Sequence, residues 1–243
     1  MTMEQPVRAL GTMLISIVTP LLNEEEYVER FLNHLTGLNG AFELILVDGG
    51  SSDHTLEIVE RNLEKLGDKV ALFRVRPGRA VQMNAGAVRT RGDVLLFLHA
   101  DCLVPTDILE LVTKALRSSQ VVGGGFMQRF SDTDLLLTFV SNFGNLRSRL
   151  TKTFFGDSAI FLRKNVFDAI KGYGDSALLE DVQLCRRAKR NGKLVQIRRY
   201  VSTSPRRYVY HGRFFLTAIY VIVCFLDLFY WRPTFLGRYI SDR

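Results

Sequence analysis

The sequence predicts an α/β fold, with a mixed, mostly parallel sheet and helices on both of its faces. Short apolar runs alternate with helical patterns through the first half of the 243 residues. The runs are apolar along their whole length instead of alternating with polar residues, which is typical of strands covered on both faces. The length and a hydrophobic content of 47% suit one large core.

Four of these runs are expected to be buried strands, each bounded by Gly, Pro, Asp or Asn. They are residues 14–19 (LISIVT), 43–47 (ELILV), 70–75 (VALFRV) and 93–98 (DVLLFL). A helix capped by Asn23 is expected after the first strand, and further helices near Ser52, at residues 80–89 and after Pro105. Strands separated by helices favour a parallel arrangement.

The pattern is less regular after residue 122. Glycines 123–125 are expected to open a strand at residues 126–130, and a further strand is expected at residues 158–162. Helices are expected at residues 134–150 and 180–190, the second ending before Gly192. No repeat and no low-complexity linker divides the chain.

Cysteine usage and the N-terminus indicate a cytoplasmic protein. Cys102, Cys185 and Cys224 are far apart and odd in number, which argues against a disulfide framework and against a cysteine-built zinc site. The apolar run at residues 13–18 is too short for the core of a signal peptide.

The positive charge is concentrated near the C-terminus. The net charge is +7, and residues 194–243 hold eight arginines against Asp227 and Asp242. Such a segment suits a phosphate-bearing partner, namely a nucleoside diphosphate, an anionic membrane or nucleic acid. A solvated basic face is the alternative reading.

Residues 214–231 form a nearly unbroken apolar stretch, interrupted by Asp227. As a helix it would be apolar on every side, with aromatic residues and the flanking Arg213 and Arg232 placed as at a membrane interface. Eighteen residues is the lower limit for spanning, and Asp227 makes spanning costly, so we expect the helix to lie in the plane of the interface. Burial against its own domain or a second copy is the alternative.

Polar clusters follow three of the expected strands, where ligands of open parallel sheets gather. They are residues 19–24 (TPLLNE), 48–53 (DGGSSD) and 99–101 (HAD). Asp48 follows ILV and precedes two glycines, so we expect it to be free of capping duty and able to accept from a uracil or guanine N–H. Asn23 and Asp53 serve equally well as helix caps. GxGxxG and GxxxxGK[ST] are both absent, which disfavours dinucleotide and P-loop sites.

Five segments, in this order, resemble family 2 glycosyltransferases, which have the GT-A fold. They are SIVTPLLNEEEYVERFLNHL, LILVDGGSSDHT, GRAVQMNAGA, VLLFLHADC and LLEDVQLCRRAKRNGK, and the resemblance covers roughly residues 14–212. It implies one GT-A domain over residues 1–213, with a nucleotide-sugar half at about 1–101 and an acceptor half at 102–213. Residues 214–243 would then be an apolar helix with a basic tail.

The resemblance also implies roles for particular residues on the donor side. Asp48 matches the base-binding aspartate, and Asp101 matches the last aspartate of the DxD-type motif, whose first position is His99 here. The donor-binding set that it implies is Thr19, Pro20, Leu22, Glu24, Asp48, Arg79, Asn84, Ala100, Asp101, Arg206 and Arg207.

The same resemblance implies a divalent Mn²⁺ or Mg²⁺ on the donor diphosphate, held by Asp101 and His211. The alternative for His211 is a structural role, which is the commoner one for a lone histidine. Asp181 would be the catalytic base that takes the proton of the acceptor hydroxyl, next to Glu180. The alternative for both acids is the favourable end of a helix dipole. Gly156 and Asp157 would lie on the acceptor side, where Asp157 can equally cap a turn.

The expected activity is therefore inverting transfer of a sugar from a UDP- or GDP-sugar to a hydroxyl acceptor, a lipid-linked one among the candidates. The enzyme would be peripheral at the cytoplasmic face of a membrane, with homo-oligomerisation open. A nucleotidyltransferase would carry a glycine-rich loop after the first strand, and residues 20–23 offer none. A non-catalytic basic membrane or nucleic-acid-binding protein is the other rival. Nucleic acid is not expected, because the aromatic and basic residues do not alternate.

Overall fold

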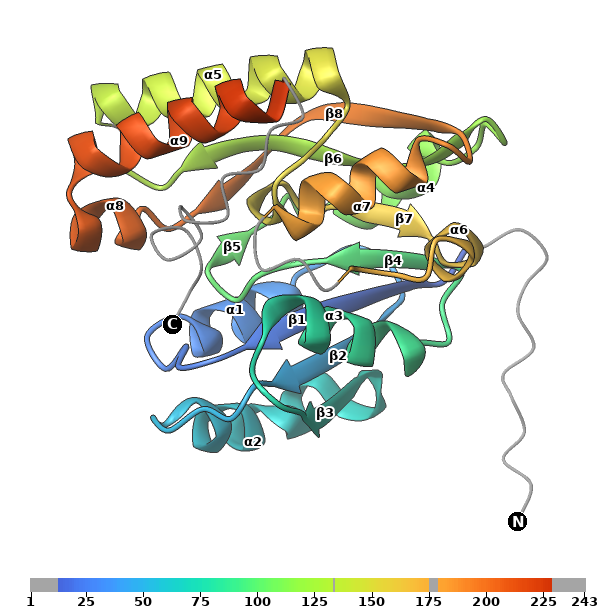
Figure 1. Cartoon of the computed structure of the whole chain (residues 1–243). Coiled ribbons are helices and arrows are strands. Elements are labelled where there is room, and N and C mark those ends of the chain that lie inside the picture. Colours follow the sequence, from blue (N-terminus) through green and yellow to red (C-terminus); the bar gives the residue numbers. More distant parts are fainter. Residues whose placement is uncertain (1–12, 133, 175–178, 229–243) are drawn as a thin grey trace.

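The computed structural model describes residues 13–132, 134–174 and 179–228. They form an α/β fold around one 8-stranded sheet (Figure 1). Strands β5 and β7 run antiparallel to their neighbours and the others run parallel, so the expected mixed, mostly parallel sheet is confirmed. The sheet order is β3-β2-β1-β4-β7-β6-β8-β5. The strands are β1 (Ile15–Leu21), β2 (Phe42–Asp48), β3 (Val70–Arg74), β4 (Val94–Phe97), β5 (Cys102–Leu103), β6 (Val121–Phe130), β7 (Phe161–Arg163) and β8 (Lys193–Thr203).

Helices cover both faces of the sheet, as expected. In β2, Leu44 and Leu46 pack into one apolar cluster, while Ile45 and Val47 pack into another on the opposite face. The first cluster includes residues of α1 (Val28–Leu35), α2 (Thr55–Leu66) and α4 (Ile108–Ala115). The second includes residues of α3 (Arg79–Val88), α6 (Lys164–Ala169) and α7 (Glu180–Ala188).

A further layer lies outside strands β6 and β8. It contains α5 (Leu135–Thr151), α8 (Arg206–His211) and α9 (Arg213–Leu228), which share a small buried cluster. Figure 1 shows α5 and α9 lying alongside each other in this layer. The expected helix at residues 214–231 coincides with α9 as far as Leu228, and residues 229–231 lie outside the described part. No helix of residues 13–132, 134–174 and 179–228 combines the length and apolar character needed to cross a bilayer.

The three glycines at 123–125 lie inside β6 and not ahead of it, so the expected start of this strand was wrong. Gly123 and Gly124 lie against the backbone oxygens of Phe161 and Val195, and a Cβ on Gly125 would meet the Phe154 ring at 2.7 Å. The glycines are needed because neighbouring backbone and ring atoms leave no room for a side chain.

Strand β8 is not among the expected elements, and its residues open the basic stretch at 194–243. Leu194, Val201 and Thr203 are buried, whereas Arg198 and Arg199 are exposed. β8 pairs with β6 on one side and with β5 on the other, where Thr203 faces Cys102. It therefore returns the chain to the residue that follows Asp101.

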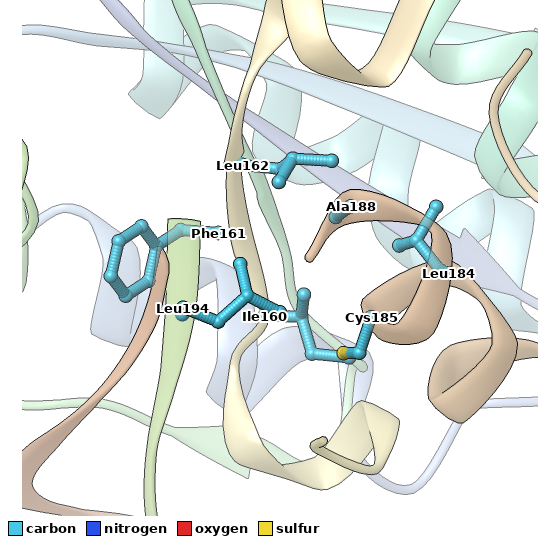
Figure 2. A pocket seen from close by; sticks show the side chains of 8 residues that line it. Ile160, Phe161, Leu162, Leu184, Cys185, Ala188 and Leu194 are labelled. Atoms are coloured by element: carbon cyan, nitrogen blue, oxygen red, sulfur yellow. The ribbon is translucent and has the colours of Figure 1, made fainter. Parts of the chain in front are cut away.

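An apolar gap lies between β6, β7 and α7 (Figure 2). It is lined by apolar side chains and glycine and has no room for a water molecule. The lining residues are Gly124, Ile160, Phe161, Leu162, Leu184, Cys185, Ala188 and Leu194. The gap is a packing feature of the core and not a substrate pocket.

Candidate active site

The carboxyl ends of β1, β2 and β4 lie on the same edge of the sheet, because these strands are parallel neighbours. Leu21, the last residue of β1, is opposite Asp48, the last residue of β2. Thr19 is fully buried within β1, and its Oγ1 has no hydrogen-bond partner among the described residues. Pro20 and Leu22 are half-buried beside it.

The Asp48 carboxylate is fully buried and is turned onto its own loop. It accepts from the backbone N–H of Gly50 at 2.9 Å and from that of Ser51 at 3.0 Å. The Arg74 Nε lies 3.3 Å from its Oδ2. The expectation that Asp48 has no local capping duty was therefore wrong, because the loop folds back over the carboxylate.

The loop after β1 is joined to the loop after β2 by polar contacts. The Asn23 side-chain oxygen accepts from Ser52 N–H at 2.9 Å, and the Glu24 N–H donates to Thr55 Oγ1 at 2.7 Å. Asn23 has a φ of 54°, and α1 begins only at Val28 without a side-chain cap. The cap expected at Asn23 is therefore wrong, because the residue serves a contact between loops.

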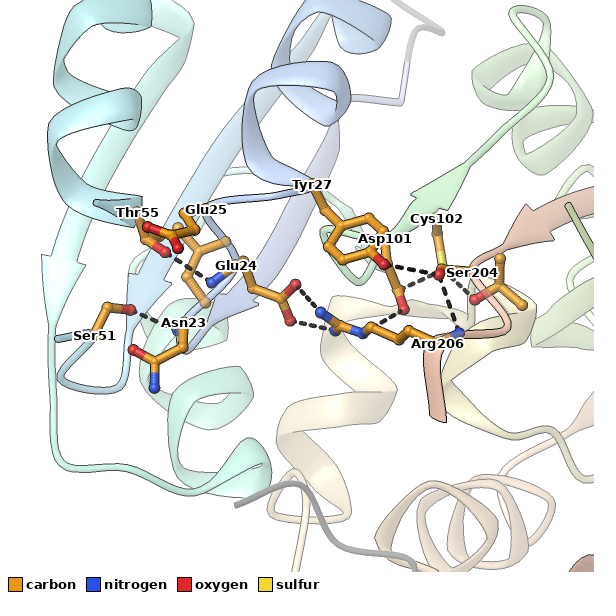
Figure 3. Close-up of polar contacts among 12 residues, drawn as sticks. Asn23, Glu24, Glu25, Tyr27, Ser51, Thr55, Asp101, Cys102, Ser204 and Arg206 are labelled. Carbon is orange, nitrogen blue, oxygen red and sulfur yellow. Dashed lines mark hydrogen bonds and ion pairs between the residues drawn. The ribbon is translucent and has the colours of Figure 1, made fainter. Parts of the chain in front are cut away.

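Arg206 from α8 reaches the residues at the ends of β1 and β4 (Figure 3). Its Nη1 and Nη2 donate to the two Glu24 carboxylate oxygens at 2.7 and 2.6 Å. Its Nε lies 3.5 Å from Asp101 Oδ2, and its guanidinium carbon lies 4.6 Å from the centre of the Tyr27 ring. One cation thus links two carboxylates of the expected donor-binding set.

Asp157 lies close enough to Asp101, and Asp181 to Asp157, for the neighbouring negative charge to raise the pKa of Asp157 and of Asp181. Burial raises the pKa of Asp157 to about 6, and the negative charge of Asp101 adds to the rise, while the arginines at 207, 147 and 79 oppose it. Burial raises the pKa of Asp181 to about 8, and the neighbouring Glu180 adds to the rise. Asp181 is 5% exposed, and its Oδ1 has no hydrogen-bond partner among the described residues.

The start of α7 places the acidic pair. Asp181 and the apolar residues that follow it face inward, while Glu180 lies 3.7 Å from the Arg79 Nη1 of α3. The positive end of the helix dipole favours both charges, but the burial of Asp181 outweighs it, since the pKa is raised.

Gly156 lies between His99 and Asp181. A Cβ at this position would be 2.6 Å from His99 Nε2 and 2.9 Å from Asp181 Oδ2. The backbone N–H of Gly156 also stabilises the charged form of Asp181. His99, which follows β4, and Asp181, the second residue of α7, are thus brought together at a point where only glycine fits. Ala100 is buried next to His99.

Asn84 is engaged within the protein. Its side-chain amide donates to the Tyr173 backbone oxygen at 2.9 Å and accepts from the Tyr173 N–H at 2.8 Å. Arg187 donates to the backbone oxygens of Ile170 and Gly172 at 2.8 and 2.5 Å. Asn84 therefore holds the backbone at Tyr173, a role that its motif did not suggest.

Two residues of the site were missed in the sequence. Tyr27, the residue before α1, stacks on Arg206 and accepts a hydrogen bond from Ser204 Oγ at 3.1 Å. Arg147 of α5 is buried, lies 4.1 Å from the centre of the Phe155 ring and favours the charged form of Asp157. Spacing gave no signal for Tyr27, because its partners Ser204 and Arg206 lie far along the chain. It gave none for Arg147, because the partner Phe155 lies beyond the end of α5.

A divalent cation fits the chemistry of Asp101. The Asp101 carboxylate already faces a cationic group, the Arg206 guanidinium. No group of three or more His, Cys, Asp or Glu side chains within the described ranges is arranged to hold a metal. A hard cation held by one carboxylate and by substrate phosphates matches this donor set. The side chain of His211 lies outside the described part, so its expected metal contact stays a prediction.

Comparisons with known proteins agree on one family. A family model described as glycosyl transferase family 2 matches residues 16–171. An undecaprenyl-phosphate 4-deoxy-4-formamido-L-arabinose transferase of Pseudomonas aeruginosa is 33% identical over 117 residues, which are 45% of this chain and 34% of that protein. A PGL/p-HBAD biosynthesis glycosyltransferase of Mycobacterium bovis is 32% identical over 170 residues, which are 68% of this chain and 64% of that one. The chain thus aligns with only part of each relative.

The fold is shared with a solved mannosyltransferase from Pyrobaculum calidifontis, in complex with GDP-Man and Mn²⁺. The TM-score is 0.73 at 18% identity, and the match covers 91% of this chain and 66% of that one. An identity this low shows the fold alone, whereas the family model covers more than half of the chain. The chain therefore has the GT-A fold and belongs to glycosyltransferase family 2.

Proposed function

We propose that this protein transfers a sugar from a UDP- or GDP-sugar to a hydroxyl acceptor with inversion at the anomeric carbon. The observation that carries the proposal is the buried Asp181 carboxylate, whose Oδ1 lacks a partner among the described residues and whose charge is coupled, through Asp157, to the region of Asp101. Residues 1–101 would supply most of the donor site and residues 102–213 the acceptor side.

Asp181 would act as the general base. A pKa of about 8 is close to neutral pH, where a carboxylate accepts a proton more readily than an ordinary aspartate does. The acceptor hydroxyl gives its proton to Asp181 as its oxygen forms the new bond to the anomeric carbon. The bond to the diphosphate oxygen breaks on the opposite face, which inverts the configuration. Glu180 and Arg79 would set the local charge, and Gly156 and Asp157 would lie beside the acceptor.

The donor would lie along the ends of β1, β2 and β4. Thr19, Pro20, Leu22 and Asp48 would surround the nucleoside, with Glu24 at its edge. Arg206 and Arg207 suit a diphosphate, since arginine binds phosphate in a bidentate manner. Asp101 would hold Mn²⁺ or Mg²⁺ together with the diphosphate, and the ion would stabilise the negative charge of the leaving group.

The acceptor is proposed to be lipid-linked. The Pseudomonas aeruginosa relative is named for undecaprenyl-phosphate, which supports an acceptor of this class. Residues 214–231 would contact the membrane surface, and the protein would then lie at the cytoplasmic face. The family match argues against the nucleotidyltransferase and non-catalytic alternatives.

The substitution Asp181→Asn tests the proposal. We expect it to keep metal-dependent binding of the donor and to reduce transfer by about 10²–10⁴-fold, the usual contribution of a general base. Binding is measured by titration calorimetry with a panel of UDP- and GDP-sugars in Mn²⁺. Transfer is measured as release of the nucleoside diphosphate, with a membrane-lipid extract as the source of acceptor.

Asp168→Asn is the matched control, because Asp168 is a largely exposed carboxylate that pairs with Lys164 in α6. We expect wild-type transfer from it. Loss of donor binding in Asp181→Asn would show that Asp181 belongs to the donor site and not to the chemistry. Failure of the wild-type protein to bind any of the nucleotide-sugars would overturn the proposed function.

A further inference from the structure

Helices α5 and α9 expose apolar side chains along one outer layer of the molecule. The main ones are Leu135, Phe139, Leu146 and Leu150 on α5 and Phe214 and Phe225 on α9. The spacing within each helix places them on one side of it. Leu135 is 88% exposed and Phe214 is 82% exposed, so these large side chains make few contacts within the chain.

The surface formed by these six residues, here called the α5–α9 face, is uncharged along most of its length. No charged residue occurs at positions 135–146 of α5 or at positions 214–226 of α9. Monomeric proteins seldom leave so many large apolar side chains together on one surface, so a partner is expected there.

Basic residues stand at one end of the face. Arg149 is exposed near the end of α5, Lys152 follows the helix, and the Lys189 Nζ donates to the Thr151 backbone oxygen at 2.8 Å. At the opposite end, Asp132 and Asp134 both bind Arg213, at 3.3 and 2.6 Å. The face therefore has a basic rim at one end, and at the other end two carboxylates paired with one arginine, which leaves a single net negative charge.

This distribution favours a bilayer over a second copy of the chain. In a two-fold dimer with the helices antiparallel, the basic rim of one copy would lie next to the other copy's Asp132 and Asp134, which keep one net negative charge after pairing with Arg213. One negative charge does not balance the three positive charges of Arg149, Lys152 and Lys189 in the rim. Residues 229–243 are no better as a cover, since they hold three arginines against one aspartate and would repel the rim. Anionic headgroups complement the rim, and acyl chains complement the phenylalanine and leucine side chains.

The face is connected to the acceptor side of the site. Phe155, which precedes Gly156 and Asp157, lies 5.6 Å from the Tyr220 ring of α9, centre to centre. The Arg147 guanidinium of α5 lies 4.1 Å from the centre of the same Phe155 ring. Both helices of the face therefore pack directly on the segment that holds Asp157.

We propose that the α5–α9 face docks on an anionic phospholipid bilayer and holds the acceptor side of the site at the membrane. Helix α5 contributes four of the six residues of this surface and α9 contributes two. That the acceptor side is held at the membrane for catalysis rests on the proposed transfer to a lipid-linked acceptor. Docking on the bilayer does not depend on that transfer.

Vesicle flotation of the full chain tests the docking. The vesicles are phosphatidylcholine alone, or phosphatidylcholine with about one third phosphatidylglycerol. We expect the wild-type protein to float with the anionic vesicles. The double substitution Phe139→Ser/Leu146→Ser should lower the partition coefficient about tenfold or more, because two apolar side chains that would enter the bilayer are lost. Val88→Ser is the matched control, since Val88 is 79% exposed at the end of α3, and it should bind as the wild type does.

Arg149→Gln/Lys152→Asn tests the basic rim. We expect binding to anionic vesicles to fall about fivefold or more per charge, with little change on phosphatidylcholine alone. Equal flotation of the apolar double variant and the wild type would overturn the proposal. A wild-type dimer in sedimentation equilibrium that the same double substitution dissociates would assign the face to a second copy instead.

Mn²⁺-dependent binding of UDP- and GDP-sugars in solution separates this proposal from the proposed function. Normal donor binding in a protein that does not float would overturn the membrane face and leave the enzymatic function standing. Flotation without donor binding would overturn the enzymatic function and leave the membrane face standing.

Discussion

Burial raises the pKa of Asp181 to about 8 and that of Asp157 to about 6, against an ordinary value of 3.8. The folded protein therefore holds these protons more tightly than the unfolded chain does. The contribution of the two carboxyl groups to the free energy of unfolding is fully present below about pH 4. It is lost as the pH rises through their pKa values in the folded protein. Stability should consequently fall between about pH 4 and pH 8.

Asp181→Asn should flatten this dependence, because the amide cannot ionise. We expect the variant to match the wild type near pH 4 and to be more stable near pH 8, by on the order of a few kcal/mol. Urea unfolding at a series of pH values measures the difference in free energy. Two parallel curves would show that the Asp181 carboxyl is not the group that titrates.

Gly156→Ala should lower activity while leaving the fold intact. The new Cβ would push on His99 Nε2 and Asp181 Oδ2, which lie 2.6 and 2.9 Å from its position. A small displacement of a catalytic group costs a large factor in rate, so we expect transfer to fall at least about tenfold. Circular dichroism and donor binding check that the protein is otherwise unchanged. Gly37→Ala is the control, because its Cβ would have an ordinary contact at 3.5 Å. Full activity in Gly156→Ala would mean that the space around Asp181 is not critical.

At the scale of elements, the strands of the first half could be predicted because each apolar run is continuous and ends at a turn-forming residue. β8 could not. Its pairing with β6 shifts register between Phe126 and Met127, which leaves Arg198 and Arg199 outside the ladder. The alternation of buried and exposed residues is interrupted there, and arginines fill the gap, so the segment resembles a basic tail.

The cap expected at Asn23 failed for a different reason. Local spacing favours a helix start at this residue, but Ser51 and Ser52 of another loop take up its hydrogen bonds. Similarly, the position of Asp48 at the end of a strand predicted that it lies at the edge of the site. The spacing of the residues gave no sign that the backbone N–H groups of Gly50 and Ser51 donate to its carboxylate. The types of residue at the site could be predicted, and their contacts across the chain could not.

Gly124→Ala should destabilise the sheet. Its Cβ would collide with the backbone oxygen of Val195 in β8, and a strand cannot move away without losing its ladder. We expect a loss of about 2 kcal/mol or more in the free energy of unfolding, in the range of an overpacked core. Chemical denaturation measures it. Gly37→Ala serves again as the control, and a stable Gly124→Ala protein would show that β6 and β8 can separate at this point.

The loop after the first strand and the helix after the last strand are tied together across the molecule. Glu24 follows β1, and Arg206 lies beyond β8, yet the two form a bidentate ion pair. The sequence predicted a helix at α5 and another at α9, but not that the two would form one outer layer. Apolar periodicity identifies a buried side of a helix without naming the element that covers it.

Arg206→Lys should loosen the C-terminal segment. Lysine cannot make the paired bonds to Glu24 or stack as well on Tyr27, so we expect a loss of about 1–2 kcal/mol and faster amide exchange in α8. Hydrogen–deuterium exchange with mass spectrometry localises the effect. Arg199→Lys is the control, because Arg199 binds Asp107 on an exposed surface, where an ion pair contributes little. Unchanged exchange in α8 would show that other contacts hold this segment.

The position of β8 has a consequence for the order in which the protein is made. β5 directly follows Asp101, and its partner is the end of β8, about a hundred residues later, where Cys102 faces Thr203. A growing chain that has left the ribosome only as far as residue 192 contains β1 to β7 but lacks β8, the partner of β5. The segment next to Asp101 can become fixed only late in translation, so early folding of the N-terminal half leaves this corner of the molecule unfinished.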